Sequence, residues 1–486
     1  MANAEHLRHL LDGTWAEWRR DNPRLLPDLV EAELRGAKLR GINFAHAVLM
    51  RTDLREADLT GSAFTKANMD GVRLDNAKLD EADLSGVHLD MLDLRGCSFR
   101  RAVLDGTTFR GSDLTGCDLS GARLNGANLE GAVLDKVNLA GADLTGAAVR
   151  GARLESADLT GATLAGVVLE GVILSGIKLR GANLEGVYAV RAQFVGADLS
   201  GARMVKANMR ETNLVKARLA GADCEGADFT NATLKDSNLE ETRLVNCDMS
   251  STDLRDATIL NAYLDGAQFV GANLSGLDLR TAKLGRPLLA RANLKGANLS
   301  RMSLRMAQMQ QAKLEGADLR EANLESALLG QAWLSGVNAR GARLRQTVLT
   351  GAVLADADFS GCDLILANLA GADCTRCDLR FSKLVGADCS KARFAWSDLR
   401  NADLSKAAVG GANFWGARML KARVPGSAVF WKLLNGIAAV FIGARRQREE
   451  KIQRDAQRRV RETARLVEKL EEKDPRMRRF SGPNKR

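Results

Sequence analysis

An apolar residue returns every five positions from Leu29 to Val424, through 80 repeats without one insertion or deletion. Fifty-five of the 80 are Leu, the others are Phe, Met, Val, Ile, Cys or Ala, and none is polar. An α-helix repeats about every 3.6 residues and a flat strand about every two. Side chains spaced five residues apart would therefore not stay on one side of either element. The pattern therefore requires a backbone that turns a corner after every five residues.

The other positions of the repeat indicate what such a backbone looks like. Two residues before each apolar position stands a small residue, most often Ala, and the remaining positions hold mostly Asp, Asn, Lys or Arg, then a polar residue, then Gly. A square coil points the large and the small residue inward, because a narrow core has no room for two large side chains per side. Gly at the corner eases the sharp turn. With four sides to a coil, the 80 repeats predict 20 coils and, at about 4.8 Å per coil, a rod of roughly 95 Å.

Stretches such as ADLTG, ANLEG and ADLSG match the pattern A-(D/N)-L-x-x and resemble the pentapeptide-repeat family from residue 27 to about 424. The resemblance implies an all-β fold, a right-handed quadrilateral parallel β-helix, and usually no enzymatic activity. The best-understood members of that family shield DNA gyrase by imitating the shape and negative charge of duplex DNA. No particular residue motif defines that role, and this chain carries a net charge of +10.

The N-terminal residues 1–28 differ from the repeat. Residues 5–21 carry apolar side chains at near-helical spacing and predict one short helix lying over the open first coil, which would otherwise expose a sheet edge. The N-terminus shows no basic region followed by an apolar run, so we expect a cytoplasmic protein. The apolar side chains of this segment are Leu7, Leu10, Leu11, Trp15 and Trp18.

The C-terminal end divides into two further segments. Residues 425–444 contain the apolar run AVFWKLLNGIAAVFIGA, and residues 445–486 hold 16 Lys or Arg against 8 Asp or Glu, with the spacing of a basic amphipathic helix. The apolar run is interpreted in three ways: a cap on the last coil, a membrane-contacting segment whose Arg-rich flank stays cytoplasmic, or a docking helix or coiled coil. The residues that would dock on a membrane or a partner are Phe430, Trp431, Leu433, Leu434, Phe441, Arg445 and Arg446.

No catalytic, cofactor-binding or metal-binding residues are predicted. The pair Cys374 and Cys377 has the spacing of a metal or redox site, but the repeat register points all eight cysteines into the core, where they act as small apolar residues. The four His are scattered, and the outward Asp residues form ladders rather than an acid–base pair. Nucleic acid is not the expected partner, because acids interleave with the bases of the tail.

The outward residue just before each Leu sorts into four faces, because residues 20 apart stack on one another. One face is entirely polar at this position and has nine Asp against five Lys or Arg. Two adjoining faces carry apolar side chains that gather into two clusters along a shared edge. Scattered exposed apolar residues are normal, but clusters on adjoining coils are typical of an interaction surface. The candidate surface comprises Val168, Ile173 and Tyr188 in the first cluster, and Leu328, Trp333, Val348 and Val353 in the second.

These observations favour a non-enzymatic scaffold or adaptor that binds protein partners along this edge, with the C-terminus as a tether to a membrane or complex. The alternative is a DNA-mimicking protein that binds or protects a topoisomerase such as gyrase. The polar face has an excess of four negative charges at the position just before Leu. This charge density is far lower than that of duplex DNA, which carries about one charge per 1.7 Å of axis.

Overall fold

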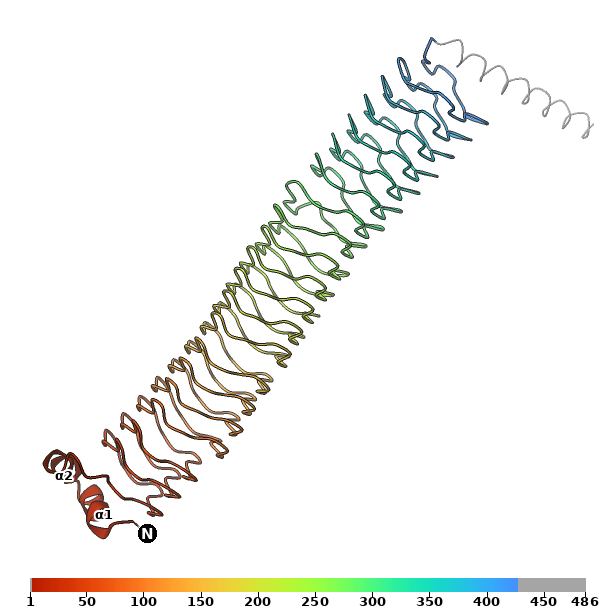
Figure 1. Cartoon of the computed structure of the whole chain (residues 1–486). Helices are drawn as coiled ribbons and strands as arrows, with labels where there is room; N and C mark the ends of the chain where they lie inside the picture. Colours follow the sequence, from red (N-terminus) through yellow and green to blue (C-terminus); the bar gives the residue numbers. More distant parts are fainter. Residues whose placement is uncertain (1, 427–486) are drawn as a thin grey trace, which may run out of the picture.

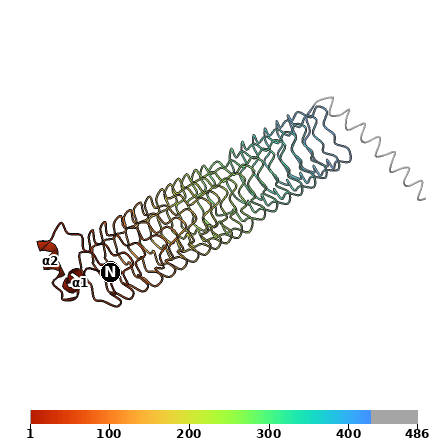
Figure 2. The same ribbon diagram turned by 60° about the horizontal axis from the view of Figure 1, so that its bottom comes forward.

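The computed structural model describes residues 2–426, and these residues form a long, narrow rod (Figure 1). Two short helices stand at the N-terminal end of the rod, and the described chain ends at the opposite end. A second view shows the rod as a stack of similar closed coils (Figure 2). No helix among residues 2–426 is long and apolar enough to cross a membrane.

The coils stack in one constant register. Parallel bridges join residues 20 apart, from Asp28 with Val48 to Asp403 with Arg423. Each side contributes one bridged residue before the chain turns, so the described ladder consists of isolated bridges rather than extended strands. A typical rung has the Leu29 amide donating to the Val48 carbonyl at 2.9 Å. The absence of longer strands follows from the corner after every fifth residue.

The core is a single column of inward side chains. The Leu-type and small positions are buried along most of the solenoid, as at Leu274 and Ala272, and only partly buried at its C-terminal end, as at Met419 and Val424. Backbone at the corners lies in the left-handed region, as at Gly161 with φ of 67° and Asn401 with φ of 60°. Gly adopts this conformation at no steric cost, whereas other residues are strained there. Many corners are nevertheless not Gly, so stacking between coils must hold them in place.

The N-terminal segment forms two helices where the spacing predicted one. Helix α1 spans Ala4–Leu11 and helix α2 spans Trp15–Asp21. Gly13, with φ of 77°, turns the chain between them, which a single helix could not accommodate. The helices contact the first coils, since the Trp15 indole N–H donates to the Asn43 carbonyl at 2.9 Å and its ring lies 5.8 Å from that of Phe44.

Close hydrogen bonds between coils are missing at four places in the described solenoid, which we call openings, although at Val149 and Leu154 the bridges of Ala148 with Val168 and of Arg153 with Ile173 persist. The amides of six Leu-position residues there lack the usual bond to the next coil, although the other Leu-position amides from Leu29 to Leu404 make it. Two of the openings, one at Met69 and Leu74 and one at Val149 and Leu154, cross the same two adjoining faces. The amides concerned are those of Met69, Leu74, Val149, Leu154, Ile259 and Leu284.

The openings lie where large side chains occupy the small inward position of the following coil. A single Val there, as at Val137 or Val187, leaves the ladder intact. Two large neighbours, or one Leu or Met, overfill the narrow core and separate the coils, because overpacked cores relax by shifting backbone. The residues above the openings are Val87 with Leu92, Val167 with Val172, Leu277, and Met302.

Candidate interaction surfaces

The first cluster lies on adjoining coils as the register predicts. Val168 is bridged to Tyr188, and Ile173 follows Val168 across the corner onto the neighbouring face. Val168 and Ile173 are each 55% exposed, which is high for large apolar side chains. The three side chains therefore face solvent together, outside the packed core.

The second cluster has the same arrangement further along the rod. Leu328 is bridged to Val348 and Trp333 to Val353. Trp333 is 48% exposed and Val353 is exposed, whereas Leu328 and Val348 are half-buried. The Lys313 ammonium lies 5.9 Å from the centroid of the Trp333 ring, within reach of a cation–π contact.

The two clusters occupy equivalent positions on the same faces. The sequence numbers of Val168 and Leu328 differ by 160, as do those of Ile173 and Trp333, and of Tyr188 and Val348. With four five-residue sides per coil this separation is eight coils, or about 38 Å at about 4.8 Å per coil. The ladder keeps each pair of equivalent residues in one stacked column.

Further exposed apolar residues stand at corners, outside the positions just before Leu that define the predicted surface. Met306 and Leu366 occupy corner positions with φ of 56° and 59°, and both are exposed. The five-residue pattern has Gly or a polar residue at this position. An apolar residue there was the sequence signal that could have predicted these exposed side chains. Others near the C-terminal end are Phe381, Trp396, Trp415 and Leu420.

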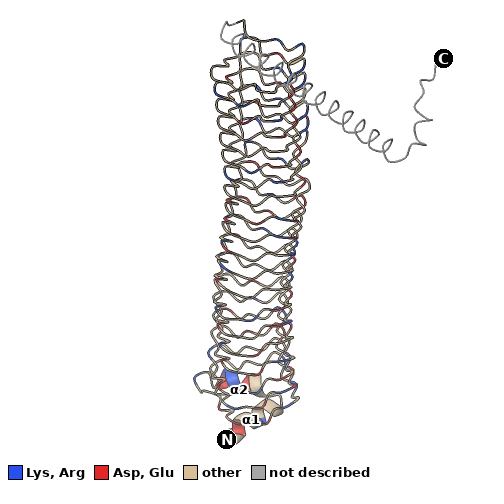
Figure 3. Ribbon diagram, turned by 90° about the vertical axis from the view of Figure 1, so that its right-hand side faces the viewer, with Lys and Arg blue, Asp and Glu red and all other residues tan. Residues whose placement is uncertain are grey.

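One face of the rod lacks charged residues over four successive coils, and we call it the uncharged face. It carries Leu328 and Val348 at its centre and Met306 and Leu366 at one corner, with several Gln, Thr and Gly between them. Charged residues occur along the whole length of the rod in Figure 3, and each of these four coils has charged side chains on other sides. The uncharged face comprises residues 306–311, 326–331, 346–351 and 366–371.

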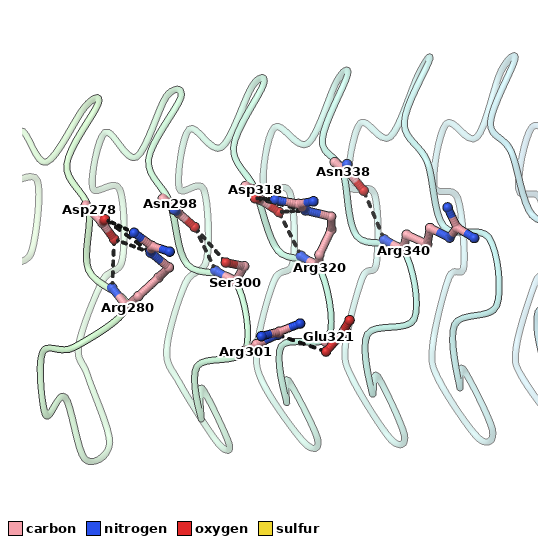
Figure 4. A network of polar contacts seen from close by, with 10 residues as sticks. All are labelled: Asp278, Arg280, Asn298, Ser300, Arg301, Asp318, Arg320, Glu321, Asn338 and Arg340. Carbon is pink, nitrogen blue, oxygen red and sulfur yellow. Dashed lines mark hydrogen bonds and ion pairs between the residues drawn. The ribbon is translucent and has the colours of Figure 1, made fainter.

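The polar face is covered by paired charges (Figure 4). Asp318 accepts hydrogen bonds from the guanidinium of Arg320, with Nη2 at 2.6 Å from Oδ2, and Asp278 is paired with Arg280 in the same way. The Arg320 side chain lowers the pKa of Asp318 mainly through this hydrogen bond. The same pairing recurs at Asp378 with Arg380 and at Asp398 with Arg400. The aspartates of this face are therefore largely neutralised by their own neighbours.

A depression of about 730 Å³ lies beside the first cluster. It is lined by small residues such as Gly146 and Ala148, by Val168, and by the charged residues Glu130, Arg150 and Glu170. It coincides with the ladder opening at Val149.

All eight cysteines are buried and free, which confirms the prediction that they face the core. Burial raises the pKa of the Cys117 and Cys389 thiols to about 12, so the reactive thiolate is scarce at neutral pH. The Sγ of Cys377 lies 2.8 Å from the Leu354 carbonyl, and its thiol donates to it. Among residues 2–426 no group of three His, Cys, Asp or Glu side chains could hold a metal ion. The predicted docking residues from Phe430 to Arg446 lie outside the described residues.

A stack of square coils with a buried Leu column defines this chain as a β-solenoid repeat protein. A family profile described as Pentapeptide repeats (8 copies) matches it in thirteen segments, most of them overlapping, between residue 28 and residue 401. The chain belongs to the pentapeptide-repeat family, whose fold is the right-handed quadrilateral β-helix. No protein of curated function matches the sequence.

Similar solved structures include three pentapeptide-repeat proteins. HetL from the cyanobacterium Nostoc sp. strain PCC 7120, involved in heterocyst differentiation regulation, is 21% identical over 71% of this chain and 92% of its own, with a TM-score of 0.13. Full-length QnrB1, a plasmid-mediated fluoroquinolone resistance protein, is 22% identical over 41% and 92%, with a TM-score of 0.22. A thylakoid-lumen protein of Arabidopsis thaliana is 30% identical over 22% and 71%, with a TM-score of 0.16.

Proposed function

We propose that the protein is a non-enzymatic, cytoplasmic scaffold that binds protein partners along the edge shared by the two clusters. The observation that carries the proposal is the placement of two exposed apolar clusters on the same faces, eight coils apart. Apolar residues gathered in this way make stable contacts when a partner removes them from water. Family membership supports the absence of catalysis, since pentapeptide-repeat proteins are generally non-enzymatic.

The C-terminal segments complete the proposal as a tether. Residues 425–444 are apolar and residues 445–486 are basic, so this end suits attachment to a complex or to an anionic membrane surface. The solenoid then carries recognition, and the C-terminal end carries attachment.

A DNA-mimicking function receives less support from the polar face. The residues just before Leu on this face have an excess of four negative charges, but the residues two positions further on have eight Arg against Asp80 and Glu240. Together the two columns carry a net charge of +2. The ion pairs between them leave a mixed surface, whereas a DNA mimic needs a continuous negative one.

The test is capture of partners from the native host with matched variants of the full chain. The double substitution Val168→Glu with Ile173→Glu places two charges in the first cluster. The control, Thr163→Glu with Asn183→Glu, places two charges at equivalent outward positions on another face. We expect the first variant to lose the captured protein and the second to retain it. Equal capture by both variants would show that the cluster is not the binding surface.

A further inference from the structure

The uncharged face is the largest interruption in an otherwise charged surface. In a chain with 27% charged residues, four successive coils present a face with none. Leu366 is 56% exposed and Met306 49% exposed at its corner, and the adjoining Trp333 is exposed as well. Such a face has no charged groups for water to solvate, so a covering segment removes water from it without the free-energy cost of desolvating a charge. Its composition matches the interior of an interface rather than free surface.

The described chain ends on the border of this face. The last bridged residue, Arg423, stacks on Asp403, three residues before Lys406, which shares a corner column with Leu366 and Gly386. The described chain ends three residues after Arg423, at Gly426. Three coils separate Gly426 from Leu366, or about 14 Å. The described chain therefore ends close to the column that leads down to the uncharged face.

The segment that follows has the matching composition and length. Residues 428–444 contain a single charged residue, Lys432. Seventeen residues span about 25 Å as a helix, which equals the height of about five coils. That length reaches from Gly426 past Leu366 to the coils of Val348 and Leu328.

The path between Gly426 and the face is compatible with this placement. Its first coil presents the small residues Ala408, Gly410 and Gly411 beside Lys406 at one corner. The next coil presents Asp388 as its one acidic side chain, with Lys391 at the other corner. Asp388 lies two coils below Gly426, about 10 Å away, and Lys432 lies about 8 Å along a helix that starts there. A helix that runs down this path from Gly426 would bring the single cation of the segment to the level of the single anion of the path. Lysines at the bordering corners can turn their long side chains into water.

We infer that the apolar segment 428–444 folds back along the rod and lies on the uncharged face of the same chain. The segment then covers Leu328 and Val348 of the second cluster, while the first cluster stays open. A partner that needs both clusters must displace the segment, which makes the segment an internal competitor for that partner. The inference concerns the free protein and stands whether or not the proposed partner binding is correct.

Photo-crosslinking of the purified full chain, without any partner, tests the inference. We replace Trp431 or Phe441 singly by the photoreactive residue p-benzoylphenylalanine and locate the crosslinks by mass spectrometry. We expect Trp431 to crosslink near Ala408 and Gly410, and Phe441 to crosslink among residues 326–351, further down the same face. A mixture of isotopically heavy and light chains should give crosslinks only within one chain.

Two matched variants sharpen the experiment. Leu366→Lys places a charge under the segment at a left-handed corner, a position that Lys406 already occupies in the same column. Phe381→Lys makes the same change at an exposed corner with φ of 59° on another edge. We expect Leu366→Lys to abolish the Phe441 crosslinks and Phe381→Lys to leave them unchanged.

Four results would overturn the inference. Crosslinks confined to the last coil, around Met419 and Val424, would show a cap. Crosslinks between heavy and light chains would show that a second copy occupies the face. Crosslinks to lipid alone, when anionic phosphatidylserine vesicles are present, would show a membrane segment. Equal loss of crosslinks in both Lys variants would show that the face has no special role.

Discussion

At the residue scale, the corner position is governed by the coil above it as much as by its own backbone. Trp396 occupies a corner with φ of 62°, and its ring lies where a Cβ at Gly416 would stand, only 2.5 Å from Cε3. Leu366 has the same relation to Gly386, and Met91 to Gly111. A large corner residue is thus accommodated by a Gly one coil later, whose missing side chain makes room for it.

Replacing Gly416 by Ala should therefore cost more stability than replacing Gly336 by Ala. Both glycines stand in the same corner column with positive φ, but nothing lies within 4 Å of a Cβ at Gly336. We expect Gly336→Ala to cost about 1 kcal/mol from backbone strain alone, and Gly416→Ala to cost about 2 kcal/mol or more because Trp396 must move. Urea unfolding measures both. Equal costs would contradict the contact between coils.

Asp53 should make part of the stability of the first coils depend on pH. The side chain is buried, and the Arg55 guanidinium, hydrogen-bonded at 2.9 Å from Nε to Oδ1, is the main cause that lowers the pKa of this carboxyl to about 2. A lowered pKa in the folded state contributes stability above the unfolded value of about 3.9. That stability is lost as the pH falls from about 4 to 2.

We expect Asp53→Asn to lower the thermal midpoint at pH 7 and to flatten its fall between about pH 4 and pH 2. The control is Asp70→Asn, because the Asp70 carboxylate accepts no bond from a guanidinium within residues 2–426. Circular dichroism melting over the pH series measures both variants. A fall with pH as steep in Asp53→Asn as in the unchanged protein would contradict the assignment.

At the element scale, the ladder openings show how far the repeat pattern determines local structure. The five-residue period was sufficient to predict the inward Leu column, the buried cysteines and the stacking of Val168 with Tyr188. It was insufficient for the openings, because they depend on which large residues meet inside one coil, such as Val167 with Val172. It also missed Leu366, whose corner position depends on Gly386 rather than on its own repeat.

Amide hydrogen exchange should report the openings directly. The amides of Val149, Leu154, Val168 and Ile173 lack their bonds between coils, so we expect them to exchange faster than those of Leu129 and Leu134 one coil earlier. Replacing Val167 and Val172 together by Ala should restore protection, since the overfilled core is relieved. Mass spectrometry of the exchanged protein measures this. Uniform protection along the rod would show that the ladder is closed.

At the scale of the whole molecule, the five-residue register of the chain can be kept while the face on which a residue lies is changed. Removing residues 226–245 deletes one whole coil and leaves every later residue on its own face. Removing only residues 226–230 keeps the five-residue pattern but moves every later side a quarter-turn around the rod. Both deletions should leave a folded solenoid, because each coil contacts mainly its neighbours.

The two deletions should differ in partner binding. The whole-coil deletion keeps the two clusters on the same side of the rod, about 4.8 Å closer together, and should retain a partner that touches both. The single-repeat deletion places them on different sides and should reduce binding by tenfold or more, at about 1.4 kcal/mol per tenfold. Quantitative capture of the partner measures the ratio, and equal binding by both would show that only one cluster is used.

The eight-coil spacing of the clusters makes the rod a molecular ruler. A partner with two matching sites about 38 Å apart, held by its first contact, would meet the second at a high effective concentration. A partner with one site, or with sites at another spacing, would gain nothing from the second cluster. Selection among partners would then depend on the number of coils between the clusters, a property that changes in whole steps as repeats are gained or lost in evolution.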